Sequence, residues 1–174
     1  MRHNYYTYIY MCAATFATLL LGGCKISYSP SGSSIDYNVT KTITINDFPN
    51  QAPLVYPPLS QSFTEGLRDK YTRQTKLRTV SANGDIELEG EITGYDVAPM
   101  AIKEDAYSSM TKLTMTVRVR FTNRSNPDKD FEQNFSAFRE FDSNLMLQDV
   151  QDSLNEELTK EIADQIYNAT VADW

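Results

Sequence analysis

The sequence predicts an α+β fold, a two-layer sandwich in which two helices cover one face of a four-stranded mixed sheet. Four segments alternate apolar and polar residues with the two-residue period of a half-buried strand. Two further segments repeat apolar residues at helical spacing. The predicted element order is β-α-β-β-β-α, and because each element has one apolar side, packing in two layers leaves the other sheet face polar and open.

The first strand is predicted over residues 39–46 (VTKTITIN), where Val39, Ile43 and Ile45 share one side. A connection with four prolines follows over residues 47–58, and proline makes such a segment stiff and extended. The first helix is predicted over residues 59–75. One face of that helix carries Leu59, Phe63, Leu67 and Tyr71.

Three more strands are predicted over residues 85–95, 112–121 and 130–141. The turn-forming residues 123–128 (NRSNPD) indicate that the last two strands form a hairpin. A final helix is predicted over residues 147–169. Its apolar stripe consists of Val150, Leu154, Leu158, Ile162, Ile166 and Ala169.

The start of the chain is typical of an exported lipoprotein. Residues 1–23 contain one basic residue, Arg2, and then an apolar run of about ten residues, which is signal-peptide length rather than the roughly 20 of a membrane span. Leu21-Gly22-Gly23-Cys24 is similar to a lipobox, so we expect cleavage before Cys24 and acyl chains on that cysteine. Residues 24–38 are then a lipidated cysteine and flexible tether, and residues 39–174 form a single domain.

Composition excludes several classes of enzyme. The single histidine and one of the two cysteines lie in the segment that would be cleaved, and Cys24 would carry lipid. The mature chain would therefore lack Ser-His-Asp and Cys-His catalysis and zinc sites built on His or Cys. We expect no cofactor, no metal and no enzymatic activity. The formal net charge of −7 also argues against nucleic acid as a partner.

Several stretches together resemble the LptE family of lipopolysaccharide-assembly lipoproteins, in its Bacteroides-like branch. The stretches that carry the resemblance are residues 45–50 (INDFPN), 52–55 (APLV), 58–65 (PLSQSFTE), 85–95 (DIELEGEITGY), 117–123 (VRVRFTN) and 130–136 (DFEQNFS). The resemblance implies an outer-membrane lipoprotein that plugs the LptD-type β-barrel, assists its assembly and helps insert lipopolysaccharide into the outer leaflet. It also implies that the domain faces the periplasm or the barrel lumen.

Lys112, Arg118 and Arg120 share the polar side of one predicted strand. One interpretation is a strip that binds the phosphates of lipopolysaccharide, since arginine grips phosphate with two parallel hydrogen bonds. The other, which we favour, is cross-strand pairing with the acidic side of the strand over residues 85–95. That acidic side carries Glu87, Glu89 and Glu91.

The proline-rich connection carries Phe48, Leu54, Val55 and Tyr56. A stiff loop with apolar side chains exposed at its tip could dock on a partner. It could equally fold back over the edge of the sheet. An alternative function is that of a periplasm-facing binding or assembly lipoprotein for another envelope complex, and co-purification with one large barrel would distinguish the two.

Overall fold

The computed structural model describes residues 35–100 and 109–171. The elements are β1 (Thr42–Ile45), α2 (Leu59–Gln74), β2 (Arg78–Thr79), β3 (Ile86–Pro99), β4 (Met110–Asn123), the 3-10 turn η1 (Pro127–Lys129), β5 (Phe131–Asp142) and α3 (Leu147–Thr170).

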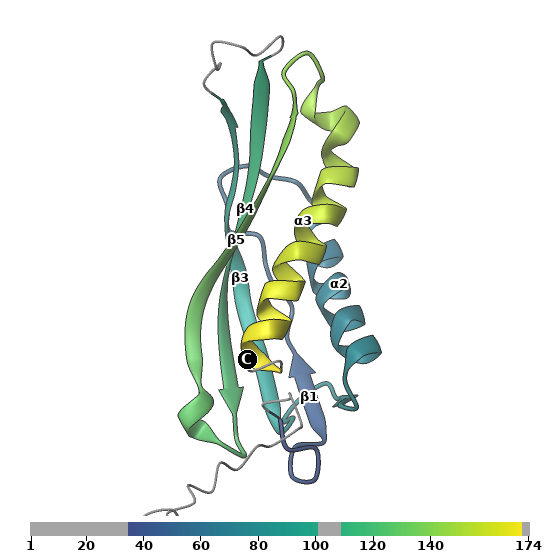
Figure 1. The fold of residues 1–174 in the computed structure, drawn as a ribbon, viewed down its shortest axis with the longest axis vertical. Coiled ribbons are helices and arrows are strands. Elements are labelled where there is room, and N and C mark those ends of the chain that lie inside the picture. Colours follow the sequence, from purple (N-terminus) through teal and green to yellow (C-terminus); the bar gives the residue numbers. More distant parts are fainter. Residues whose placement is uncertain (1–34, 101–108, 172–174) are drawn as a thin grey trace, which may run out of the picture. The chain divides into compact units, whose positions relative to one another are not determined.

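The strands form one mixed sheet in the order β2-β1-β3-β4-β5. β1 runs parallel to β2 and β3, whereas β4 is antiparallel to both β3 and β5. The two helices lie side by side on one face of the sheet (Figure 1). The predicted α+β class and two-layer arrangement are therefore confirmed.

The described sheet has five strands rather than the four predicted. The additional strand, β2, has two residues, both exposed, and is held to β1 by backbone hydrogen bonds of 2.9 Å from Arg78 N to Lys41 O and from Val80 N to Ile43 O. A two-residue strand with no buried side chain carries no hydrophobic alternation, so periodicity could not reveal it.

The start of the domain also differs from the prediction. Val39 is 60% exposed and precedes β1, because the backbone turns there, with the N–H groups of Val39 and Thr40 both bonded to Asp36 O. Ile35, in contrast, is buried in the core. Residues 35–38, assigned above to the tether, therefore pack with the domain.

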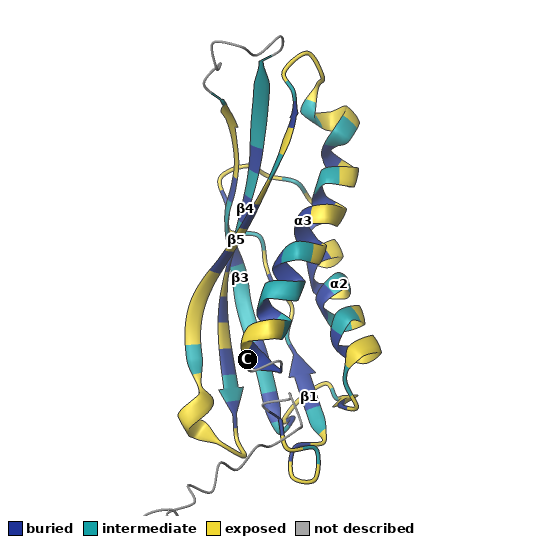
Figure 2. Cartoon of the chain, in the orientation of Figure 1, coloured by how far each residue is buried: buried dark blue, intermediate teal, exposed yellow. Residues whose placement is uncertain are grey.

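The core lies between the sheet and the helices. Figure 2 shows buried residues along β3 and β4 and on the sides of α2 and α3 that face inward. The predicted face of α2 is fully buried, as are Leu158, Ile162 and Ile166 of α3. At the end of α3 the prediction is wrong by one residue. Ala169 is exposed and Thr170 is buried instead, where its hydroxyl is hydrogen-bonded to the Tyr71 hydroxyl.

Candidate functional site

On the sheet face opposite the helices, charged side chains gather where the first half of β3 pairs with the second half of β4. Because Val117 and Val119 point into the core, Arg118 and Arg120 point to this open face. Arg120 lies between two carboxylates, at 3.0 Å from Glu89 and 3.1 Å from Glu132. The hydrogen bond that Arg120 donates to the Glu132 carboxylate is the main cause that raises the pKa of Arg120.

Arg118 and Arg124 are also paired on this face. Arg118 is bonded to Glu91 and lies 3.9 Å from Glu132, and Arg124 lies 3.0 Å from Glu87. Two of the three predicted basic residues therefore have the acidic cross-strand partners of the second interpretation. Each pair is exposed to solvent, which screens it, so the pairs contribute little to stability and a stronger anion could exchange for the glutamates. Phosphate binding by this strip stays a prediction.

Lys112 lies apart from the two arginines. It is six residues from Arg118 along β4, or about 20 Å at the rise of an extended strand. In the sheet register it faces Ala98 and Glu140, and its Nζ lies 5.5 Å from the centre of the Phe138 ring. Arg118 and Arg120 thus share one cluster of carboxylates, and Lys112 belongs to a different part of the face.

Phe48, expected to be exposed in the proline-rich loop, is fully buried. Its ring packs edge-on against Phe63, with 5.3 Å between ring centres. The Phe48 ring fits in this position because Gly90 has no side chain. A Cβ on Gly90 would lie 2.7 Å from Phe48 Cε1 and 2.1 Å from the carbonyl oxygen of Arg118. Phe48 is therefore a core residue and is not available to a partner.

The first half of the loop folds back along the edge of β3. Gln51 N donates to Ile92 O, and Ile92 N donates to Pro49 O, both at 2.9 Å. The loop tip remains accessible, since Leu54 is 36% and Val55 is 76% exposed. Of the four predicted loop residues, these two are the ones exposed at the surface.

Tyr56 closes the loop onto α3. Tyr56 is partly buried, and its ring stacks on the Tyr95 ring with 6.4 Å between ring centres. Its hydroxyl donates a hydrogen bond to the Asp152 carboxylate. That hydrogen bond, reinforced by burial, raises the pKa of Tyr56 to about 12. Tyr56 therefore holds the loop in place.

Behind Tyr56 lies a buried polar network that the sequence did not indicate. Gln151 Nε2 donates to the Tyr95 hydroxyl at 2.8 Å, and that hydroxyl donates to Asn155 Oδ1 at 2.9 Å. Burial is the main cause that raises the pKa of Tyr95. The signal that could have found the network is the pair of amides four residues apart on the apolar side of α3.

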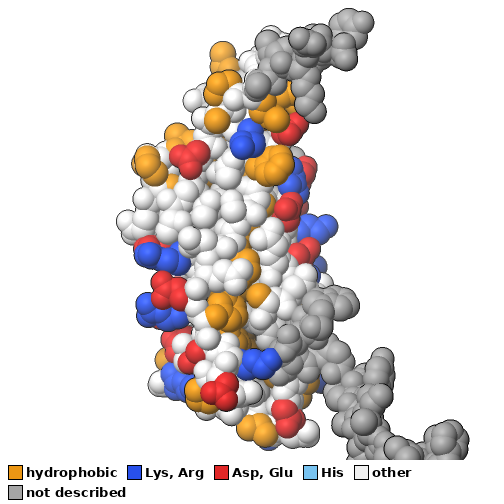
Figure 3. All heavy atoms as spheres, turned by 60° about the vertical axis from the view of Figure 1, so that its left-hand side comes forward, with side chains coloured by type: hydrophobic (Ala, Val, Ile, Leu, Met, Phe, Trp, Pro, Cys, Tyr) orange, Lys and Arg blue, Asp and Glu red, His pale blue; other side chains and the backbone are white. Residues whose placement is uncertain are grey.

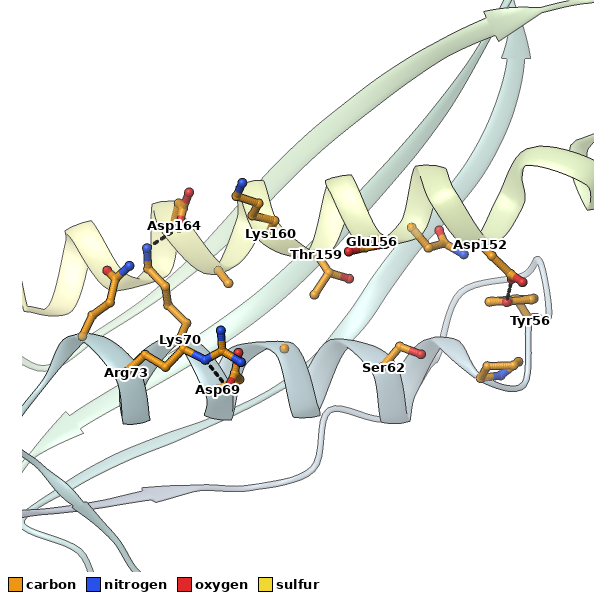
Figure 4. A pocket seen from close by; sticks show the side chains of 15 residues that line it. Tyr56, Ser62, Asp69, Lys70, Arg73, Asp152, Glu156, Thr159, Lys160 and Asp164 are labelled. Atoms are coloured by element: carbon orange, nitrogen blue, oxygen red, sulfur yellow. Dashed lines mark hydrogen bonds and ion pairs between the residues drawn. The ribbon is translucent and has the colours of Figure 1, made fainter.

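A groove of about 930 Å³ runs between α2 and α3 on their outer side (Figure 4). Ion pairs line it, Lys70 with Asp164 at 2.5 Å and Arg73 with Asp69 at 2.7 Å. At its base, the Thr159 hydroxyl has no hydrogen-bond partner among the residues the structure describes. The two signs of charge are mixed along the groove, so no ligand charge is favoured.

The described part of the chain contains no helix long and apolar enough to cross a membrane. Over the same residues, no three metal-binding side chains are grouped around a common point. The predicted lipidation site, Cys24, lies outside the described residues.

Comparison with known proteins identifies a matching family and solved structures with a similar fold. The family model of LptE, described as lipopolysaccharide-assembly, matches residues 40–170. A minor lipoprotein from Acinetobacter baumannii has a similar structure, with a TM-score of 0.50, 14% identity, and 74% of this chain and 90% of that chain covered. A hypothetical protein from Chlamydia trachomatis gives a TM-score of 0.51 at 10% identity, covering 75% of this chain and 97% of that chain. Comparison with curated protein sequences found no match.

Proposed function

The chain belongs to the LptE family of lipopolysaccharide-assembly lipoproteins, which are not enzymes, and we propose that it is the lipoprotein subunit of the outer-membrane lipopolysaccharide translocon. In this role it plugs an LptD-type β-barrel, assists the assembly of that barrel and helps lipopolysaccharide reach the outer leaflet. The observation that carries the proposal is the family match, which extends from just before β1 to the last residue of α3.

The character of the open sheet face supports a partner that surrounds the domain with polar surface. Figure 3, which brings the sheet side forward, shows charged side chains of both signs and hydrophobic side chains only in small separate groups. The glutamates and arginines of β3, β4 and β5 already neutralise one another. Such a face suits a wet barrel lumen better than a lipid-facing or strongly apolar interface.

The proposed anchor is compatible with this placement. Eleven peptide units separate Cys24 from Ile35, the first residue described in the core, and an extended chain of that length spans up to about 40 Å. Acyl chains on Cys24 would therefore hold the domain within about one bilayer thickness of the outer-membrane surface.

The test is co-purification in mild detergent of the lipidated protein, tagged after Trp174, from its own outer membrane. A single large β-barrel at near-equal stoichiometry is the expected result. A Cys24→Ala variant, which cannot carry acyl chains, is the matched control for anchoring, and any of it that stays in the outer-membrane fraction should be bound to the barrel. Recovery of the lipoprotein alone, or with unrelated envelope proteins, would contradict the translocon role.

A further inference from the structure

Beyond the charged half of the open sheet face lies a second region built around Phe138. Register places three rows of residues there, Gly94–Thr116–Ser136, Asp96–Thr114–Phe138 and Ala98–Lys112–Glu140. Residues directly opposite one another on neighbouring strands share a face, and the intervening residues Leu113 and Met115 are buried under the helices. We name the Phe138 patch from six of these side chains: Asp96, Lys112, Thr114, Ser136, Phe138 and Glu140.

Phe138 is the one aromatic side chain classed as exposed within residues 35–100 and 109–171. Its exposed fraction is 52%, even with the Lys112 ammonium 5.5 Å from the ring centre. Other described phenylalanines are buried or packed against the core. A phenyl ring on the polar side of a strand that stays about half in contact with water gains less from folding than a buried one.

The strand beneath Phe138 is held firmly. The next residue, Arg139, points to the helix side and binds Glu157 and Glu161 of α3, both at 2.6 Å. Its guanidinium also donates to the carbonyl oxygen of Phe138 at 2.8 Å. The ring is therefore presented from a fixed backbone, and binding costs less when the site is already ordered.

The surroundings of the ring indicate the kind of ligand. A protein hot spot is a residue, often aromatic, in a well-packed pocket from which water is fully excluded. Here the neighbours in the same three rows are two carboxylates, three hydroxyls, one ammonium and the methyl group of Ala98. The patch therefore offers one ring-sized apolar surface with hydrogen-bond acceptors and donors around it. A pyranose has the complementary form, with an apolar C–H face and hydroxyls at its edge.

We propose that the Phe138 patch binds a pyranose ring in the saccharide portion of lipopolysaccharide. The C–H face of the sugar covers the phenyl ring, and sugar hydroxyls donate to the carboxylates of Asp96 and Glu140. The identity of the glycan rests on the proposed function; the stacking surface rests on the geometry of β4 and β5. This part of the face is separate from the arginine–glutamate pairs around Arg118 and Arg120.

The test uses the full mature chain in detergent micelles and, as the probe, the saccharide released from lipopolysaccharide by mild acid and freed of lipid A. Saturable binding to the unaltered chain is expected, and Phe138→Ala should weaken it about tenfold. Phe138→Tyr keeps the ring and should bind nearly normally. Val39→Ala, which trims an exposed apolar side chain before β1 and outside the patch, is the matched control and should leave the affinity unchanged.

Barrel co-purification of the Phe138→Ala variant, measured in the same preparations, separates this inference from the proposed function. Retention of the barrel with loss of saccharide binding supports both. Retention of the barrel with unchanged saccharide binding overturns the site and leaves the translocon role standing. Binding of lipid A alone, or loss of the barrel together with normal saccharide binding, also overturns the site, because Phe138 would then contact acyl chains or protein.

Discussion

The contact between Gly66 of α2 and Thr159 of α3 predicts a substitution whose effect on stability reverses in sign with the neighbouring residue. A Cβ on Gly66 would lie 2.6 Å from Thr159 Cγ2, well inside van der Waals contact. Overpacking of this kind costs about 1–3 kcal/mol. Replacing glycine by alanine within a helix gains about 1 kcal/mol of helix propensity. We therefore expect Gly66→Ala to lower the free energy of unfolding by about 1 kcal/mol, the difference between these two effects.

The Thr159→Ser background removes the methyl group that causes the clash and keeps the hydroxyl. There Gly66→Ala should raise the free energy of unfolding by up to about 1 kcal/mol, since only the propensity gain remains. The difference between the effects of Gly66→Ala in the two backgrounds is the coupling energy of a double-mutant cycle, which should be roughly 1–3 kcal/mol.

Urea unfolding followed by circular dichroism, on residues 25–174 without the lipid-bearing cysteine, measures all four proteins. Equal effects of Gly66→Ala in the two backgrounds would refute the packing argument. A stabilising effect in the unaltered background would do so as well, because the helices would then have room for the methyl group.

Three further predictions concern the core, the pH dependence and the loop. Tyr95→Phe leaves the Gln151 amide without its buried acceptor and should lower the free energy of unfolding by about 1–3 kcal/mol in the same urea assay; no change would mean that the network is not formed. Backbone hydrogen bonds, chiefly from Lys41, hold the pKa of the Asp85 carboxyl below its usual value. The ionised carboxylate therefore stabilises the folded protein above about pH 4, and this stabilisation is lost as pH falls through the pKa of the folded state. Asp85→Asn should therefore lessen the loss of stability on acidification, and an unchanged acid profile would contradict this. Val55→Asp should leave stability within about 0.5 kcal/mol, since the side chain is 76% exposed, and should reduce barrel recovery if the loop tip is an interface.

Sequence periodicity predicted the elements with large buried sides. The predicted bounds of β3, β4, β5 and both helices lie within about four residues of the observed ends, and the predicted β3 and β4 are shorter than the observed strands. The prediction that Phe48 is exposed was wrong because its burial depends on Gly90. That glycine lies far away in the chain and leaves space for the ring because it has no side chain. Nothing in the loop sequence itself distinguishes a buried phenylalanine from an exposed one.

The open face was predictable as a face but not as separate sites. Alternation placed Lys112 with Arg118 and Arg120 on one side of β4. Their partners depend on the register of the β3–β4 hairpin, which puts Arg118 opposite Glu91 and Lys112 opposite Ala98. Register is set by the connection between two strands and by packing across them. The division into paired arginines and a Phe138 patch therefore required the three-dimensional structure.

We expect this protein to be required for lipopolysaccharide to reach the outer leaflet. Depletion of the protein in its own bacterium, with pulse-labelled lipopolysaccharide measured at the cell surface, tests this requirement. Newly made lipopolysaccharide should stop reaching the surface, and the intact gene product should restore delivery. Normal surface delivery after complete depletion would contradict the proposed translocon role.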